Sequence, residues 1–243
     1  MDEKIEKLAS LCEKKKLLVF TGAGVSEESG IPTFRGRNGI WSRYDPQKVS
    51  TIESFERDPT LYWNFFKEVR LPSLIDAKPN PAHYAITEIQ QKGYISAVVT
   101  QNIDGLHQLA GTQNVLELHG SSRNFVCTKC PNKFHLEIVE KLLLRDFPPK
   151  CPSCGSILRP DVVLFGEPLP ERTFLAALKA AKASSLALAV GSSLVVYPAA
   201  TIPQYAKRFA IINREPTPLD TAAAVIIHSK AAEVLPKLSE LLP

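Results

Sequence analysis

Six short runs of apolar residues recur along the chain, and most of them end at glycine or at polar residues. They cover 16–21, 96–100, 115–118, 186–190, 209–213 and 224–227. Between most of these runs lie segments with apolar residues at helical spacing, at 81–92, 104–110, 171–183, 199–208 and 230–242. Unbroken apolar runs that alternate with helices are typical of a parallel sheet covered on both faces. The pattern therefore predicts a doubly wound α/β fold.

Two stretches interrupt this alternation and predict a smaller module beside the sheet. Residues 34–78 are rich in aromatic side chains and contain one helical pattern near 58–70, while residues 123–159 hold four of the five cysteines. Insertions of this size in a compact domain usually form a subdomain or carry function. We therefore assign 1–35, 79–122 and 159–243 to the main domain, and 36–78 and 123–158 to the small module.

The composition is that of an ordinary globular protein. Hydrophobic residues make up 44% and charged residues 22% of the 243 positions, and the net charge of +4 is too small to indicate nucleic-acid binding. The charged N-terminal segment does not resemble an export signal, and no apolar run approaches the roughly 18 residues of a membrane span. We therefore predict a cytoplasmic protein with no membrane partner.

Helical spacing of Ile5, Leu8, Leu11 and Cys12 predicts an amphipathic surface helix at the N-terminus. On its apolar face, Cys12 is explained more simply as a small buried side chain than as a reactive thiol.

Cysteine spacing provides the strongest chemical signal in the sequence. Cys127 and Cys130 form one CxxC pair, and Cys151 and Cys154 form a second pair after an interval of 20 residues. In a reducing compartment, four thiolates at this spacing favour one tetrahedral Zn²⁺, and four cysteine ligands leave no position open for substrate. We predict one structural zinc. A nucleic-acid-binding zinc ribbon is the alternative, but basic and acidic residues are mixed between the two pairs.

Glycine and polar residues follow three of the apolar runs. Gly22 and Gly24 would let the backbone approach a phosphate, although the position three residues later lacks the third glycine of the usual dinucleotide fingerprint. Asn102 and Asp104 follow the second run, and taken alone they are explained more simply as helix caps. His119 closes the third run, and this position at the ligand-binding edge of a parallel sheet makes it a candidate general base.

Taken in order, these motifs resemble those of the sirtuin family. Similar segments occur at 22–35 (GAGVSEESGIPTFR), 100–107 (TQNIDGLH), 118–120 (LHG), 163–167 (VLFGE) and 191–194 (GSSL), with Asn213 and the cysteine quartet. The resemblance extends from about residue 17 to residue 236. Sirtuins are NAD-dependent protein lysine deacylases. The resemblance therefore implies a Rossmann-like domain with an inserted helical and zinc-binding module, and transfer of an acyl group from lysine to ADP-ribose with release of nicotinamide.

The resemblance also implies roles for individual residues. His119, Asn102 and Asp104 would be catalytic, and His119 would remove a proton through the ribose hydroxyls of NAD. The co-substrate NAD would contact Gly22, Ala23, Gly24, Ser26, Ser29, Phe34, Arg35, Gln101, Asn102, Ile103, Asp104, Gly191, Ser192, Ser193, Asn213, Arg214, Glu215 and Ala231. An acyl-lysine peptide would bind as an added β-strand against Val163, Leu164, Phe165, Gly166, Glu167, Val195, Val196 and Tyr197.

One departure from the family pattern concerns the acyl group. Sirtuins that prefer succinyl- or malonyl-lysine carry a Tyr-x-x-Arg pair, and the matching positions here are Phe66 and Val69. Arg70 lies one residue further along, and on a regular α-helix it would point about 100° away. The sequence therefore predicts a preference for acetyl and longer apolar acyl groups over succinyl.

Two other functions stay open at this point. NAD-dependent mono-ADP-ribosyl transfer would use the same nucleotide site, but it does not need the proton transfer assigned to His119. A catalytically inactive NAD-sensing or zinc-ribbon module would need neither His119 nor the pair Asn102 and Asp104. The presence of all three residues favours deacylation.

Overall fold

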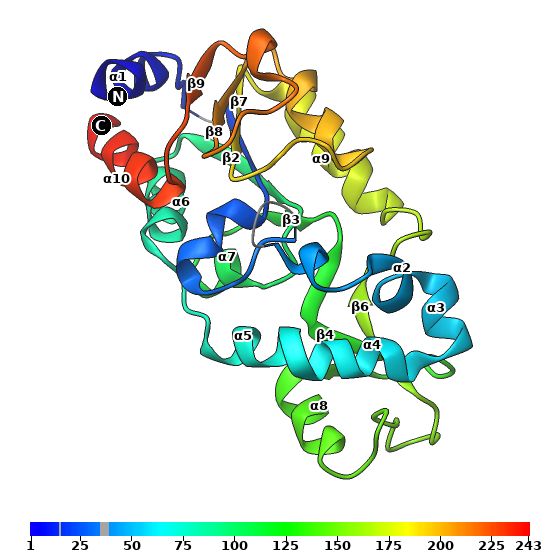
Figure 1. Ribbon diagram of the computed structural model, residues 1–243. Helices are drawn as coiled ribbons and strands as arrows, with labels where there is room; N and C mark the ends of the chain where they lie inside the picture. Colours follow the sequence, from blue (N-terminus) through cyan, green and yellow to red (C-terminus); the bar gives the residue numbers. More distant parts are fainter. Residues whose placement is uncertain (15, 35–38) are drawn as a thin grey trace.

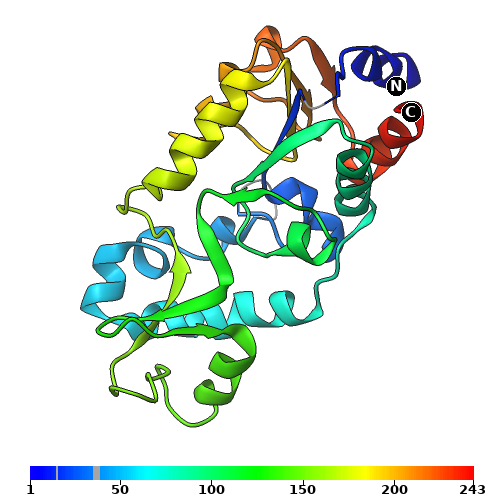
Figure 2. The same ribbon diagram turned by 180° about the vertical axis from the view of Figure 1, so that it is seen from behind.

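The computed structural model describes residues 1–14, 16–34 and 39–243, and its main body is a six-stranded sheet (Figures 1 and 2). The strand order is β3-β2-β1-β7-β8-β9, and every pairing between neighbours is parallel. The strands are β1 (Leu17–Thr21), β2 (Ile95–Thr100), β3 (Val115–Glu117), β7 (Leu186–Val190), β8 (Phe209–Ile212) and β9 (Val225–Ile227). These bounds lie within one residue of the six predicted runs. The prediction of a doubly wound α/β fold is confirmed.

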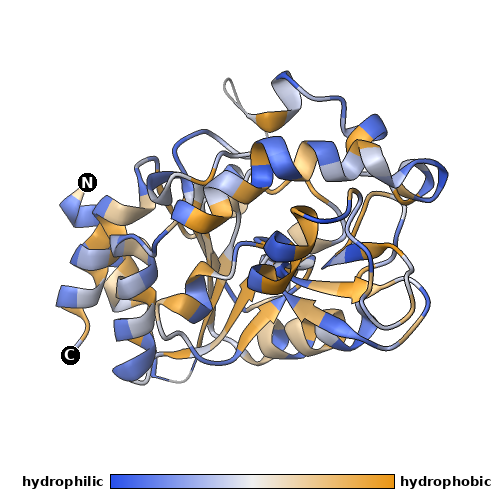
Figure 3. Cartoon of the chain, turned by 90° about the horizontal axis from the view of Figure 1, so that it is seen from below, coloured by the Kyte–Doolittle hydropathy of each residue, from blue (hydrophilic) through white to orange (hydrophobic). Residues whose placement is uncertain are grey.

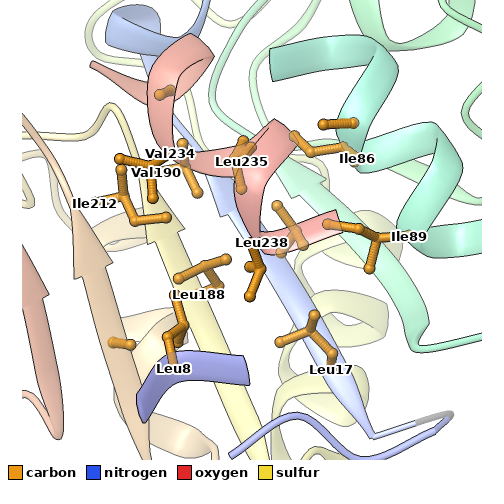
Figure 4. Close-up of a cluster of buried hydrophobic side chains, with 14 of the residues drawn as sticks. Leu8, Leu17, Ile86, Ile89, Leu188, Val190, Ile212, Val234, Leu235 and Leu238 are labelled. Atoms are coloured by element: carbon orange, nitrogen blue, oxygen red, sulfur yellow. The ribbon is translucent and has the colours of Figure 1, made fainter. Parts of the chain in front are cut away.

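Helices α1 (Asp2–Ser10), α6 (Pro81–Gln91) and α10 (Ala231–Leu241) cover one face of the sheet. Side chains alternate along a strand, so Leu17 and Leu188 both point to this face. Figure 4 shows them beside labelled leucine and isoleucine side chains of the three helices. This face therefore holds the largest apolar cluster of the described residues.

The opposite face packs against α9 (Glu171–Ala183) and the 3₁₀ helix η5 (Ala199–Tyr205). Leu18 and Phe20, the alternate residues of β1, are fully buried there. The sequence pattern predicted an ordinary helix in place of η5. Pro203 lies inside this segment and has no backbone N–H to donate, which favours the tighter turn.

A second, three-stranded antiparallel sheet has the order β5-β4-β6 and was not predicted from the sequence. Trp63 stacks on Phe125 with ring centroids 5.7 Å apart, and the indole N–H of Trp63 donates to the carbonyl of Leu158 at 3.1 Å. One apolar cluster thus joins the aromatic stretch to the cysteine stretch and supports our proposed small module. Its elements are α2 (Pro46–Val49), α3 (Ile52–Arg57), α4 (Pro59–Phe65), the π-turn η4 (Phe66–Arg70), α5 (Leu71–Asp76), β4 (Gly120–Cys127), β5 (Lys133–His135), α8 (Leu136–Leu143) and β6 (Leu158–Val162). Strands β4 and β6 extend across the proposed boundaries at residues 122 and 159.

The remaining helices are short and connect the larger elements. They are η1 (Ala23–Val25), η2 (Glu27–Ser29), η3 (Ile40–Ser42), α7 (Leu106–Leu109) and η6 (Asp220–Ala222). Figure 3 shows strongly hydrophobic residues along the strands of the sheet and hydrophilic residues on the outer helices. Within the described residues, none of the helices has the length and apolar character needed to cross a membrane.

Candidate active site

A cleft with a volume of about 1530 Å³ opens at the carboxyl ends of the central strands. Gly22, Gln101, Gly191 and Asn213 line it, and they directly follow β1, β2, β7 and β8. Parallel sheets bind ligands at this edge. Pockets for one small molecule usually measure roughly 300–1,000 Å³, so this cleft has room for two substrates.

Two glycine turns form the floor of the cleft. The N–H of Gly24 donates to the carbonyl of Gly191 at 2.8 Å. A Cβ added to Gly24 would lie 2.8 Å from the Cα of Gly191, and Gly191 has a φ of +60°. Only glycine allows both this contact and this backbone conformation without strain. The backbone is thereby left open to a phosphate group, as the sequence predicted for Gly22 and Gly24.

A buried polar chain connects this floor to Asp104. The amide of Asn102 donates to the carbonyl of Gly22 and to the hydroxyl of Ser26, both at 3.1 Å. The hydroxyl of Ser26 then donates to the carboxylate of Asp104 at 2.8 Å, and the other carboxylate oxygen accepts the N–H of Leu106 at 2.9 Å. Hydrogen bonds thus hold both oxygens of Asp104. Asn102 is a structural donor here as well as a cleft-lining residue, so its role extends beyond a helix cap.

Two buried histidines lie beside this chain of hydrogen bonds, and no sequence pattern singled them out. The Nε2 atom of His83 lies 3.4 Å from the Ser26 hydroxyl, and its Nδ1 accepts the N–H of Asn80. The ring centroids of His83 and His107 are 5.0 Å apart. Burial lowers the pKa of His83 to about 4 and the pKa of His107 to about 3, and for His107 the neighbouring His83 adds to the effect. Both rings are therefore neutral at physiological pH.

His119 lies at the wall of the cleft, and one of its ring nitrogens has no hydrogen-bond partner among the described residues. Its Nδ1 lies 2.9 Å from the carbonyl of Gln101. Because a carbonyl oxygen only accepts, Nδ1 carries the proton, and Nε2 of the neutral ring holds a lone pair. Burial lowers the pKa of His119, and the bond to Gln101 opposes this shift. His119 is thus a neutral base within the cleft.

Most of the other predicted nucleotide contacts also line the cleft, namely Ala23, Phe34, Ile103, Ser192, Ser193, Arg214, Glu215 and Ala231. Three predicted residues are set back from its surface. Ser26 and Asp104 are buried beneath the wall, and the hydroxyl of Ser29 accepts a hydrogen bond from Asn80 at 3.0 Å. Arg35 lies outside the described residues.

Both of the predicted peptide-binding segments line the cleft. The lining residues are Val163, Leu164, Phe165, Gly166 and Glu167 in one segment, and Val196 and Tyr197 in the other. Val195, next to Val196 in the sequence, is exposed. The backbone N–H groups of Val195 and Tyr197 have no hydrogen-bond partner among the described residues. Alternate free N–H groups are what an added strand requires.

The predicted orientation of Arg70 is wrong. The N–H of Leu71 bonds to the carbonyl of Phe66, so one wide π-turn spans this part of the helix. The extra residue in the turn brings Arg70 to the cleft, where Tyr62 and Phe65 also lie. Phe66 is instead buried in the aromatic cluster of the small module.

The sulfur atoms of four cysteines lie about as close together as the ligands of one metal ion. The sulfur atoms of Cys127, Cys130, Cys151 and Cys154 all lie within 4.8 Å of one another. The separations are 3.4 Å for Cys127–Cys154 and 3.6 Å for both Cys130–Cys151 and Cys130–Cys154. A tetrahedron with Zn–S bonds of about 2.3 Å has edges on the order of 3.8 Å. The four side chains therefore fit one Zn²⁺ ion.

Comparison with known proteins agrees with this geometry. Residues 22–198 match the model of the Sir2 family. The chain is 49% identical to NAD-dependent protein deacylase 2 of Archaeoglobus fulgidus, over 99% of this chain and 96% of that protein. It is 47% identical to the NAD-dependent protein deacylase of Pyrococcus furiosus, over 95% and 94% of the two. A solved Sir2 variant with deacetylated p53 peptide and 3′-O-acetyl ADP-ribose has a TM-score of 0.92 and 38% identity, over 97% of each chain. The chain belongs to the Sir2 family.

Proposed function

We propose that this chain is an NAD-dependent protein lysine deacylase that transfers the acyl group from lysine to ADP-ribose and releases nicotinamide. The observation that carries this proposal is the joint position of a neutral His119 and the Asn102–Ser26–Asp104 chain at one cleft. The cleft is large enough for a dinucleotide and an acyl-lysine side chain together. The relatives of this chain are named as deacylases and deacetylases.

The glycine floor supports a site for NAD. Gly22, Gly24 and Gly191 would hold the phosphates, while Asn213 and Glu215 at the end of β8 would hold the adenosine. Ile103 also lines the cleft, and the carboxylate of its neighbour Asp104, which two hydrogen bonds hold in place, would suit the polar carboxamide of nicotinamide. NAD would supply a ribose carbon that becomes reactive when nicotinamide leaves.

The proton transfer is assigned to His119. Its Nε2 lone pair is available at neutral pH, because burial keeps the pKa of the ring below its usual value. The bond from Nδ1 to the Gln101 carbonyl fixes the ring orientation. His119 would accept the proton of a ribose hydroxyl, so that the acyl group can move from lysine to that oxygen.

The peptide would bind as an added strand along these two cleft-lining segments. Free N–H groups at Val195 and Tyr197 would bond the peptide backbone and make few demands on its sequence. Selectivity would then depend mainly on the acyl-lysine side chain that enters the cleft. A cytoplasmic location, predicted from the sequence, accompanies this proposal.

The test is chromatography of an acetyl-lysine peptide incubated with NAD and enzyme. We expect equal amounts of nicotinamide and free-lysine peptide, and a loss of roughly 10²–10⁴-fold in rate for His119→Ala. His135→Ala, which changes an exposed histidine of the cysteine region, is the matched control and should keep the wild-type rate. Nicotinamide release with no deacylation of the peptide would contradict the proposal and indicate ADP-ribosyl transfer.

A further inference from the structure

The side chain of Arg123 joins the segment that carries Asp104 to the helices of the small module. Its Nε donates to the backbone carbonyl of Asp104 at 2.5 Å, and its Nη2 donates to the carbonyl of Leu74 at 3.1 Å. Leu74 lies in the last turn of α5, where carbonyls lack an N–H partner within the helix and a cation is favourable. One guanidinium therefore connects the end of this helix to the segment that follows β2.

An irregularity in β4 brings Arg123 to this place. The pairing of β4 with β6 is interrupted between Ser121 and Phe125, so the residues between them do not continue the ladder. The N–H of Ser122 donates instead to the carbonyl of Ile103 at 2.7 Å, and Arg123 follows directly. Interruptions of this kind are common beside active sites, where they redirect a side chain. The start of β4 is thus bonded to the segment after β2 by its backbone as well as by Arg123.

Gly105 leaves the room that the Arg123 side chain occupies. Gly105 has a φ of +72°, and a Cβ added to it would lie 2.8 Å from Cδ and 3.0 Å from Nε of Arg123. Both the backbone conformation and the close approach favour glycine at this position. A larger residue would move the guanidinium away from the carbonyl of Asp104. The segment and the arginine therefore fit each other closely.

With Arg123, every oxygen atom of Asp104 accepts a hydrogen bond. The two carboxylate oxygens accept from the N–H of Leu106 and the hydroxyl of Ser26, and the backbone carbonyl accepts from Arg123. Asp104 is only 3% exposed, so without Arg123 its carbonyl would be buried with no charged donor. Hydrogen bonds from a charged group are stronger than those between neutral groups. Loss of Arg123 would therefore loosen the segment that carries Asp104.

We propose that Arg123 is a positioning residue for the nicotinamide end of the cleft. It acts through the carbonyl of Asp104, holds residues 103–105 in place and fixes them to the end of α5. Arg123 is not among the residues that line the cleft, so it acts without contact to NAD or to the peptide. This inference rests on the proposed deacylase function, and it adds a residue that no sequence motif singled out.

The test compares the two ends of the cleft in Arg123→Met, which keeps an apolar stem beside Gly105 and removes both donors. Product inhibition by nicotinamide measures the Asp104 end. Binding of ADP-ribose, which lacks nicotinamide, measures the glycine floor by calorimetry. Because charged hydrogen bonds are removed at one end only, we expect the inhibition constant of nicotinamide to rise about tenfold or more and the Kd of ADP-ribose to stay within about twofold. An unchanged inhibition constant overturns the inference. Equal weakening of both ligands does so too, because it would indicate a general loss of structure.

Lys133→Met is the matched control. Lys133 is an exposed cation on β5, in the same small sheet, and its ammonium lies 3.6 Å from the carboxylate of Asp161. This variant should leave both constants unchanged, and a rise in the nicotinamide constant as large as that of Arg123→Met would overturn the inference. Wild-type enzyme that neither binds ADP-ribose nor releases nicotinamide would refute the proposed function itself. If the wild type does both and Arg123→Met matches it, only the role of Arg123 is refuted.

Discussion

The positions of the protons at the cleft are set by oxygen atoms that can only accept a hydrogen bond. The carbonyl of Gln101 fixes the tautomer of His119, and the carboxylate of Asp104 fixes the hydroxyl direction of Ser26. The proposed base is therefore prepared before substrate arrives, which lowers the reorganisation that the reaction requires.

The pH dependence of catalysis tests this residue-scale account. Only neutral His119 can accept a proton, and burial lowers its pKa from 6.5. We expect kcat/KM to rise with pH, with a midpoint below 6.5, and then to level off through neutral pH. The measurement is initial rates between about pH 5 and pH 8 at low substrate concentration. A midpoint above 7 would contradict the depressed pKa.

Sequence position was enough to find His119, because a polar residue after a parallel strand faces the ligand edge. It was not enough to find His83 and His107, whose segments show only ordinary helical patterns. Both are buried where α6 and α7 pack together, and the hydroxyl of Thr21 on β1 contacts Nε2 of His107 at 2.9 Å. No local pattern reveals a contact across 86 positions.

At the scale of elements, the glycine turns after β1 and β7 depend on each other. Gly191→Ala would push a Cβ into the backbone of Gly24 and strain a φ of +60°. We expect the KM for NAD to rise tenfold or more. Gly93→Ala is the matched control, since its φ of +83° carries the same strain but nothing lies within 4 Å of its Cβ. Steady-state kinetics at varied NAD concentration would distinguish the two variants. An equal rise in the KM for NAD in both would contradict the proposed phosphate site.

Removal of the metal tests the structural role of the four-cysteine cluster. Four thiolates would join the carboxyl end of β4 to the loop before β6, so one Zn²⁺ should be released per chain on chelation. We expect a lower melting temperature for the chelated protein and for Cys151→Ser, and no such change for Cys12→Ser. Metal analysis combined with thermal denaturation checks both points. Full stability after complete metal removal would exclude a structural role.

Strands and helices with a clear hydrophobic pattern were predictable from the sequence. Elements whose structure depends on contacts with residues far away in the sequence were not. Every residue of β1 and β7 is buried and nearly all of them are apolar, because helices cover both faces of the sheet. By contrast, β4 mixes polar and apolar residues and is defined mainly by its antiparallel partners, so no run indicated it. The π-turn before Pro72 could not be inferred from α-helical spacing, and this led to the wrong orientation for Arg70.

For the whole molecule, the buried histidines link stability to pH. Their folded-state pKa values lie below 6.5, so they stay neutral in the folded protein while the unfolded chain binds protons more readily. Their stabilising contribution is complete above about pH 6.5 and is lost as the pH falls towards about 4 for His83 and about 3 for His107. Each contributes up to about 1.4 kcal/mol per pH unit within that window.

Urea denaturation between pH 7 and pH 4 checks this linkage. His107→Gln should flatten the dependence of the unfolding free energy on pH, whereas His135→Gln should not. The comparison with His135→Gln separates this effect from acid release of metal, which all variants share. Identical slopes in the three proteins would contradict the assignment.

The destination of the acyl group distinguishes the proposed reaction most directly from simple hydrolysis. The measurement is mass spectrometry of the products formed from NAD and a peptide with ¹³C-labelled acetyl-lysine. We predict that the label appears in an acetylated ADP-ribose, in an amount equal to the deacetylated peptide. Label found only in free acetate from the first turnover onward would show simple hydrolysis and would contradict the proposed reaction.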